Sequence, residues 1–413
     1  MEKEEQQEKQ HASPCMQKRR IKRNTKPELP EDLIHNEILT RLPAKYLVRF
    51  SLVCKSWRSL ISNSKFVNSH LTRLLSCNYD KDEDLMIYKK DTTDHGIFFQ
   101  SNSDEIHPRA VSRICDRLVG SINGLVCMSS RYGEKFCLWN PATAQLVEVD
   151  LPLQHSKNCR HVLGGFTWDH LRNDYKVVVL CHEIPNESSR KICIYSSSSA
   201  SWTEVDVIDH SMWPEGRPYF PFTVPNTIVK GIPYYLRQSE LTVHKFVVEV
   251  NKFIYLPPLD SNKIRDKVFT IVNVKNCLVG MARNYQDNSV DIYSLDDESP
   301  GGAWSKMYTT EPVILRSCVP SQCYRNSGKI LIASYAVPLS AINRKIKETT
   351  ELAEFHRDYH SYNRICFSYT PSLVYVQGMK SMLEFLRCKK SHRSTLKMSS
   401  PFCNWFSSYS DCQ

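Results

Sequence analysis

Residues 135–141 read Lys-Phe-Cys-Leu-Trp-Asn-Pro, a short apolar run that ends in an aromatic residue and stops at Asn-Pro. Aromatic and β-branched residues favour strands, and Asn-Pro is typical of a turn. A similar unit returns at 191–195 as Lys-Ile-Cys-Ile-Tyr and at 290–293 as Val-Asp-Ile-Tyr. The pattern therefore predicts a strand that recurs along the chain.

The recurrence has the spacing of a β-propeller. Trp139 and Tyr195 are 56 residues apart, and Tyr195 and Tyr293 are 98 apart, which is two steps of 49. Propeller blades of four strands repeat at about 40–50 residues, so a propeller of about six blades fits better than a sandwich. Because the repeats are not identical in sequence, the number of blades stays open. The last strands are expected at 364–367 and 373–377, after a charged, helix-prone segment at 343–360 that is either a loop insertion or a closing element.

A short helical region precedes the strands. Pro-Glu-Asp at 30–32 is typical of a helix start, because proline fits the first turn and acidic residues favour the positive end of the helix dipole. Ile34, Ile38 and Leu42 then line one apolar face, and Pro43 ends this helix and can begin the next. A helical module of about 45 residues is near the lower limit for independent stability. Its apolar faces therefore point to a binding partner.

The net charge of +10 is concentrated in the two ends of the chain. Residues 1–26 and residues 387–413 each carry a net charge of +4, which leaves +2 for the 360 residues between them. We therefore expect two disordered basic tails and no nucleic-acid partner. The basic run at 18–23 can be a nuclear import address, or it can belong to a tail that serves only solubility. With no apolar signal segment and no apolar run of membrane length, we expect no membrane partner and a cytoplasmic and/or nuclear location.

The sequence predicts neither a metal nor a cofactor. The sixteen cysteines contain no Cys-x-x-Cys pair, and buried, reduced thiols are the simplest interpretation. His356 and His360 could share a helical face, but no second ligand pair follows them, so a solvated pair is favoured. No phosphate-binding, dinucleotide-binding or nucleophile-elbow motif occurs, so no catalytic residue is assigned. Asp169 and Asp174 could pair as catalytic carboxylates, but a turn role suits their strand–turn–strand setting better.

Two families are suggested by longer motifs. The segment from Leu-Pro-Glu-Asp-Leu-Ile at 29–34, through Arg-Leu-Pro-Ala-Lys at 41–45, to Val-Cys-Lys-Ser-Trp-Arg at 53–58 resembles the F-box. The following region resembles the domain that is C-terminal to the F-box in plant proteins, the F-box-associated domain. The motifs that carry this second resemblance are Gly-Ser-Ile-Asn-Gly-Leu-Val-Cys at 120–127 and Leu-Trp-Asn-Pro-Ala-Thr at 138–143. Gly164-Gly165 is similar to the paired glycines of kelch blades but does not recur, so the propeller is expected to be kelch-like rather than a true kelch array.

These resemblances imply a mainly β protein in which a small N-terminal three-helix F-box is followed by a β-propeller-like domain. The expected divisions are a basic tail at 1–26, the F-box at 27–76, the propeller-like domain at 77–386 and a basic tail at 387–413. They also imply a non-catalytic substrate receptor of a Skp–cullin–F-box ubiquitin ligase. An adaptor that binds Skp without promoting turnover of a client stays an alternative, and a propeller hydrolase is a weaker one.

The F-box resemblance implies a surface for the Skp-type adaptor and, through it, the cullin. Its candidate residues are apolar and occupy the first two helices: Leu29, Pro30, Leu33, Ile34, Ile38, Leu42, Pro43 and Leu47. Some of these side chains must instead hold the helices together, and the sequence does not divide the two groups. For the protein client, the aromatic-rich stretch at 212–220 is the candidate, with Trp213, Arg217, Tyr219 and Phe220. A packed connection between blades is an equally good interpretation of that stretch.

Overall fold

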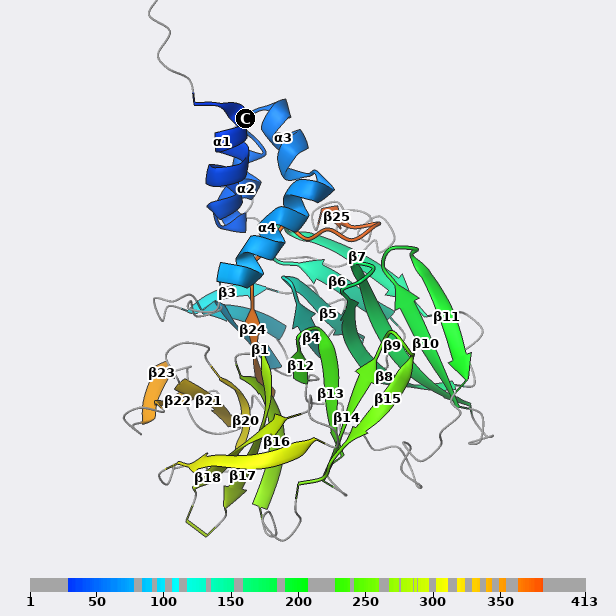
Figure 1. The fold of residues 1–413 in the computed structure, drawn as a ribbon, viewed down its shortest axis with the longest axis vertical. Coiled ribbons are helices and arrows are strands. Elements are labelled where there is room, and N and C mark those ends of the chain that lie inside the picture. The colour runs from blue at the N-terminus through cyan, green and yellow to red at the C-terminus, as the bar shows by residue number, and fades with distance from the viewer. Residues whose placement is uncertain are drawn as a thin grey trace, which may run out of the picture. The chain divides into compact units, whose positions relative to one another are not determined.

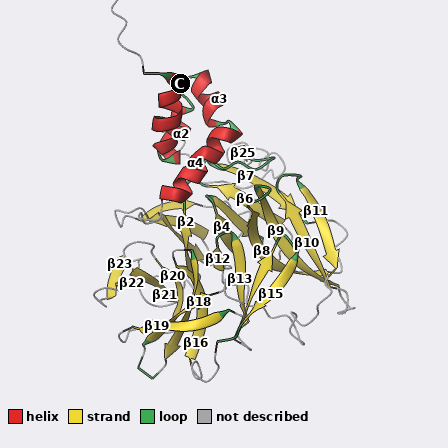
Figure 2. Ribbon diagram, in the orientation of Figure 1, coloured by secondary structure: helices red, strands yellow, loops and turns green. Residues whose placement is uncertain are grey.

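The computed structural model describes residues 29–77, 84–90, 95–100, 106–110, 117–130, 135–151, 159–183, 190–206, 227–237, 241–259, 267–274, 276–284, 286–287, 289–296, 302–310, 318–323, 329–334, 339–343, 349–353 and 363–381. The chain divides into two compact units, residues 1–39 and residues 40–413, and each is described by itself. The described helices all lie before residue 78, and the described elements after it are strands (Figure 2).

The first unit contains most of the first predicted helix. α1 (Glu31–Leu33) continues directly into the π-helical turn η1 (Ile34–Ile38), and the 3-10 turn η2 (Leu39–Arg41) begins at the last residue of the unit. The carbonyl of Pro30 accepts hydrogen bonds from the amides of Leu33 at 3.0 Å and Ile34 at 3.2 Å. The predicted start of the helix at Pro30 is therefore confirmed.

The second unit begins with three further helices, α2 (Ala44–Phe50), α3 (Lys55–Ile61) and α4 (Ser64–Cys77). Pro43 begins α2 as the sequence predicts, because its carbonyl accepts a hydrogen bond from the amide of Tyr46 at 2.9 Å. The predicted helices of the F-box region are thus present, and α4 follows them as an additional helix.

In the part of the chain that the structure describes, six antiparallel sheets follow the helices, and we number them as blades 1 to 6 in chain order (Figure 1). In spatial order, blade 1 contains β24 (Asn363–Tyr369), β1 (Asp84–Lys90), β2 (His95–Gln100) and β3 (Ile106–Ala110). Blade 2 contains β4 (Arg117–Ile122), β5 (Leu125–Ser129), β6 (Lys135–Asn140), β7 (Gln145–Asp150) and β25 (Lys380–Ser381). Blade 3 contains β8 (Cys159–Asp169), β9 (Asp174–Glu183), β10 (Arg190–Ser196) and β11 (Ser201–Asp206). Blade 4 contains β12 (Thr227–Val229), β13 (Ile232–Arg237), β14 (Thr242–Val247) and β15 (Lys252–Leu256). Blade 5 contains β16 (Lys267–Val274), β17 (Cys277–Asn284), β18 (Val290–Asp296) and β19 (Ala303–Thr309). Blade 6 contains β20 (Cys318–Cys323), β21 (Lys329–Ser334), β22 (Leu339–Asn343) and β23 (Thr349–Ala353).

The six blades close into a ring through a strand from the end of the chain. β24 pairs with β1 along its whole length, from Asp84 opposite Tyr369 to Lys90 opposite Asn363. β24 also contacts β20 of blade 6 and β4 of blade 2. Blade 1 is therefore built from three early strands and one late strand, and the chain forms the predicted propeller with six blades.

The aromatic-ended strands that suggested the repeat occupy the same position in successive blades. Trp139 lies in β6, Tyr195 in β10 and Tyr293 in β18, and each of these is the third strand of its blade in chain order. In the blade between the last two, the third strand is β14, which contains Phe246. The 98-residue step between Tyr195 and Tyr293 spans two blades because β14 lies between them. The repeat in the sequence is thus a repeat of one structural position.

Packing between blades explains the long aliphatic run at 177–180. Val177 and Val179 of β9 lie in one buried cluster with Phe136 of blade 2. Val178 points to the opposite face of the sheet, into a cluster with Phe246 of blade 4. Because a strand in the middle of a blade is covered on both faces, it is apolar at successive positions instead of alternating.

One local prediction near the end of the chain is wrong. The helix-prone segment at 343–360, which the sequence left open as a loop insertion or a closing element, contains the strand β23 at Thr349–Ala353, which pairs with β22. The predicted strand at 373–377 lies outside any sheet; the next strand is β25 at Lys380–Ser381. The carbonyl of Val374 accepts a hydrogen bond from the side chain of Asn140, so this segment is held by a side chain and not by a neighbouring strand.

Candidate functional site

The first unit presents apolar side chains to solvent along the first helix. Leu29 is 59% exposed, Leu33 is 47% exposed and Ile38 is 43% exposed. Pro30 is also exposed, whereas Ile34 is half-buried. Several large apolar side chains exposed close together are costly to leave in water, so this face is suited to a protein partner.

In the second unit, burial separates the three remaining predicted contact residues. Pro43 is exposed and Leu42 is half-buried, but Leu47 is fully buried with 0% exposure. Leu47 therefore belongs to the residues that hold the helices together, a division that the sequence left open. A helix turns one residue in three or four towards its core, and only packing shows which one.

The sequence analysis did not select two further exposed apolar residues, Leu52 and Val53. Both lie in the turn between α2 and α3 and are more than half exposed. Tyr46 on α2 is exposed as well. A signal was available, because Leu52-Val53 follows the apolar stripe of α2 at a position that the stripe does not require. These residues extend the candidate adaptor-binding surface within the second unit.

His70 braces the helices of the second unit. Its Nε2 lies 2.9 Å from the carbonyl oxygen of Leu42, and its ring stacks on Phe66 with centroids 6.4 Å apart. Because a carbonyl can only accept, Nε2 carries the proton of the neutral ring. The side chain is buried, and burial lowers the pKa of His70 below its ordinary value, although the hydrogen bond to Leu42 acts in the opposite direction.

We expect this brace to weaken as the pH falls below about 6.5, the ordinary pKa of histidine. Below that value the unfolded chain gains a proton at His70 before the folded chain does, so protonation favours unfolding. His70→Gln keeps an amide donor for the Leu42 carbonyl but does not titrate. The stability advantage of wild type over His70→Gln, measured by chemical unfolding, should shrink between about pH 7 and pH 5, and the other histidines cancel in the comparison. An advantage that stays constant with pH would contradict this assignment.

Side-chain hydrogen bonds hold residues 370–376, which follow β24, against the turns of blade 2. The side-chain amide of Asn140 donates to the carbonyls of Ser372 at 3.0 Å and Val374 at 2.8 Å, while its oxygen accepts from the amide of Ala142 at 2.9 Å. At the neighbouring turn, the hydroxyl of Ser372 donates to the carbonyl of Asn123 at 2.5 Å. Asn140 and Asn123 belong to the two motifs that suggested the family, and these contacts give the motifs a physical role.

Gly124 allows this segment to approach closely. Its φ is +83°, and a β-carbon at this position would lie 2.7 Å from the carbonyl oxygen of Thr370 and would clash with the hydroxyl of Ser372. Gly378 has nearly the same φ, +84°, but a β-carbon there would meet only Val147 at an ordinary 3.4 Å.

Gly124→Ala should therefore lower the free energy of unfolding by about 2–4 kcal/mol, since it combines left-handed strain with a clash. Gly378→Ala is the matched control, because it introduces the strain without the clash and should cost about 1 kcal/mol. Urea unfolding of the two variants measures both values. Equal losses in the two variants would show that the close approach of residues 370–372 contributes nothing.

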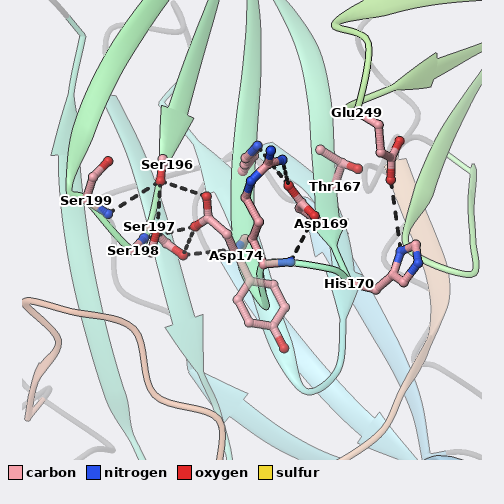
Figure 3. A network of polar contacts seen from close by, with 12 residues as sticks. Thr167, Asp169, His170, Asp174, Ser196, Ser197, Ser198, Ser199 and Glu249 are labelled. Carbon is pink, nitrogen blue, oxygen red and sulfur yellow. Dashed lines mark hydrogen bonds and ion pairs between the residues drawn. The ribbon is translucent and has the colours of Figure 1, made fainter.

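Asp169 ends β8 and is neutralised by two basic side chains (Figure 3). Its fully buried carboxylate accepts hydrogen bonds from the Arg172 guanidinium at 2.9 Å and from Lys176 Nζ at 3.2 Å. Burial alone would raise the pKa of Asp169, but these hydrogen bonds outweigh it and hold the pKa below its usual value. The carboxylate is thus kept ionised in the turn between β8 and β9.

Asp174 begins β9 and binds a different set of groups (Figure 3). It accepts hydrogen bonds from the hydroxyls of Ser196 at 2.7 Å and Ser197 at 3.0 Å, and from the amide of Ser198 at 2.9 Å. These contacts fix the serine turn between β10 and β11. Because Asp169 and Asp174 each accept hydrogen bonds that hold a turn, the predicted turn role is confirmed.

Two other contacts join blade 3 to blade 4. The hydroxyl of Thr167 in β8 donates to the carbonyl of Gly231 at 2.9 Å, and His170 Nδ1, in the turn after β8, lies 4.0 Å from Glu249 Oε1 (Figure 3). These contacts help to hold the two blades together.

Several predicted site residues lie outside the described residues. These are the client candidates Trp213, Arg217, Tyr219 and Phe220, and the histidine pair His356 and His360. Within the part of the chain that the structure describes, no three His, Cys, Asp or Glu side chains gather in a way that could hold a metal ion. The described helices include none that is long and apolar enough to cross a bilayer.

Comparison with known proteins identifies both regions. Residues 27–69 match the F-box domain, and residues 60–376 match the family described as the F-box associated beta propeller domain. This chain belongs to the F-box-associated β-propeller family. The F-box protein is 22% identical over 387 residues to the putative F-box protein At3g17490 of Arabidopsis thaliana, a match that covers 85% of this chain and 95% of that protein. It is 32% identical over 189 residues to the F-box/kelch-repeat protein At3g23880 of the same plant, which covers 42% of this chain and 50% of that protein.

Among solved structures, the F-box protein matches apo AztD from Citrobacter koseri with a TM-score of 0.35 and 9% identity, over 70% of this chain and 98% of that chain. The F-box itself implies binding of a Skp-type adaptor in Skp–cullin–F-box complexes, and with the propeller it supports a substrate-recognition role in general. F-box and F-box-associated domains are typically non-catalytic receptor modules. The kelch-like character and the domain limits 27–76 and 77–386 stay predictions.

Proposed function

We propose that this F-box protein is the substrate-recognition subunit of a Skp–cullin–F-box ubiquitin ligase and is not itself an enzyme. Its F-box holds the Skp-type adaptor, and its propeller holds a protein client that is then ubiquitinated and degraded. The observation that carries the proposal is the row of exposed apolar side chains on the F-box, Leu29, Leu33 and Ile38, in a chain whose other described region is a six-bladed propeller.

For this function the chain needs only to hold the client close to the ubiquitin-transferring subunits. Burial of an exposed leucine or isoleucine contributes about 1.5–3 kcal/mol, so a few of them can sustain a long-lived adaptor complex. A client bound to the propeller is then held at a high effective concentration near the ubiquitin-transferring subunits. The turn roles of Asp169 and Asp174 support a binding function, because the most suggestive carboxylates are already used for structure.

The test is a comparison of the full chain with a chain that lacks residues 27–76. Proximity labelling under proteasome inhibition identifies candidate clients, and their half-lives are then measured with each chain. The proposal expects clients to bind both chains but to be shortened in half-life only by the full chain. Clients whose half-lives do not depend on the F-box would instead indicate an adaptor without turnover, and failure of the full chain to bind a Skp-type adaptor would overturn the proposal.

We further propose a location in the cytoplasm and/or nucleus, where such ligases have access to their clients. The basic run at 18–23 supports nuclear entry. Replacing its lysines and arginines with glutamine in a fluorescent fusion tests this; an unchanged nuclear fraction would remove the run as a signal.

A further inference from the structure

The outer strand of a propeller blade carries a row of backbone groups that can pair with an additional strand. One such edge in this protein is already occupied. β25 pairs antiparallel with β7, with Lys380 opposite Leu146 and Ser381 opposite Gln145, so a late segment of the chain adds a fifth strand to blade 2 (Figure 1). Strand addition at a blade edge is thus a contact that this fold accommodates.

Two other outer strands carry features that discourage strand addition. The exposed residues of β11 include Ser201, Thr203 and Glu204, and Glu204 pairs with Lys191 at 3.2 Å. β19 exposes Met307 beside the charged Lys306, and its pairing with β18 is interrupted by a register shift at Ile292/Tyr293. Charged side chains and irregular pairing are the usual protections of an edge strand.

β15, the outer strand of blade 4, also carries one exposed charged residue, Lys252, but differs from both in exposing two large apolar side chains. Ile254 is 40% exposed and Tyr255 is 41% exposed, although they point to opposite faces of the sheet. β15 pairs with β14 without a register shift, and among the described strands it pairs with no other. Apolar side chains are therefore accessible on both faces of a regular edge.

The edge is also held in place. Leu256 at the end of β15 is buried in the core of blades 4 and 5. The next residue, Pro257, accepts a hydrogen bond through its carbonyl from the indole of Trp304 at 2.9 Å. A fixed strand loses little conformational entropy when a partner adds to it.

The side chains around the edge specify the chemistry of a partner. On one face, Ile254 lies opposite Lys245 and two residues from the exposed Lys252. On the other face, the ring of Phe253 contacts Phe246, with centroids 4.9 Å apart, and Tyr255 contacts His244, with centroids 4.4 Å apart. Opposite charges and apolar pairs across strands are favourable, so a matching strand is apolar on the second face and carries an acidic residue on the first.

We propose that β15 binds the client protein by strand addition: an extended, mainly apolar segment of the client pairs with Lys252–Leu256 and places an acidic side chain beside Lys252. This inference rests on the proposed function, because it names the part of the propeller that holds the client. Main-chain hydrogen bonds supply affinity, and the side chains on the two faces supply selectivity.

The experiment selects random peptides of about twelve residues, displayed on phage, against the full chain, with counter-selection against Ile254→Lys. A lysine at this position adds the kind of charge that protects natural edges. Thr203→Lys, at an exposed position of β11, is the matched control. Circular dichroism melting confirms that both variants are folded.

Selected peptides should alternate apolar positions and contain an acidic residue. We expect Ile254→Lys to weaken their binding at least tenfold and Thr203→Lys to leave it unchanged. N-methylation of alternate peptide amides should also weaken binding at least tenfold, because it removes the main-chain donors of the added strand. For peptides with an aspartate, Lys252→Glu should weaken binding, and replacing that aspartate with lysine should restore it.

Four results would overturn the proposal: no peptide specific to wild type, affinity unaffected by amide methylation, self-association of the full chain that Ile254→Lys abolishes, or tighter peptide binding after removal of residues 387–413. The third would assign the edge to a second copy of the chain, and the fourth to its own tail. Adaptor co-purification, measured on the same variants, keeps failure of this inference distinct from failure of the proposed function.

Discussion

We expect the double substitution Leu33→Asp, Ile38→Asp to abolish co-purification of the F-box protein with a Skp-type adaptor while the propeller stays folded. Both side chains are more than two-fifths exposed, so the substitutions remove apolar contact area without opening a cavity. Each lost burial costs about 1.5–3 kcal/mol of binding free energy, and the carboxylates oppose desolvation as well. Together these effects predict a loss of affinity of at least about a hundredfold, which calorimetric titration with purified adaptor measures.

Two controls separate binding from folding. Leu171→Asp alters the most exposed of the large apolar side chains outside the F-box region and should leave adaptor binding unchanged. Leu47→Asp places a charge at a fully buried position and should unfold the helices, which circular dichroism detects. If the double variant binds the adaptor as wild type does, the exposed face of the first helix is not the adaptor-binding surface.

We expect truncation before Asn363 to prevent the propeller from folding. The deletion removes β24, which pairs with β1 over seven residue pairs and contacts blades 2 and 6. It also removes Ser372 and Val374, the acceptors of the buried Asn140 side chain. A ring without its closing strand exposes the faces of two blades, so the truncated chain should be insoluble or should unfold without a cooperative transition.

A chain from which fewer residues are removed provides the control for this experiment. A chain that ends at Ser381 keeps β24, residues 370–376 and β25, and should melt within a few degrees of the full chain. Cooperative melting of the shorter chain at an unchanged temperature would show that blade 1 does not need its late strand.

Local patterns in the sequence were sufficient for the type of fold. Pro30 and Pro43 each begin a helix where predicted, because their effect depends only on the residues beside them. The aromatic-ended runs predicted strands, and their spacing indicated propeller blades. The same local reasoning was wrong at 373–377, where the backbone is held by the side chain of Asn140 and not by a neighbouring strand.

The candidate adaptor-binding residues were also accessible from the sequence, but their division was not. Leu33 and Leu47 look alike in an apolar stripe, yet one is 47% exposed and the other is fully buried. Exposure depends on which helices pack against a residue, and a stripe of spacing i, i+4 does not contain that information. Leu52 and Val53 were missed although a signal was available, because they follow the apolar stripe of α2 at a position that the stripe does not require.

The sequence alone determined that this protein has a short helical region, which resembles an F-box, a strand-rich propeller and basic ends. Helix starts and strand runs depend on neighbours along the chain, and net charge depends only on composition. Only the tertiary structure decided that β24 closes blade 1, that β15 exposes Ile254 and Tyr255 at a blade edge and that Asn140 binds the carbonyl of Ser372. That hydrogen bond joins residues 232 positions apart. Contacts of this kind depend on how the whole ring packs, since each is stable only when the blades between the two residues are already in place.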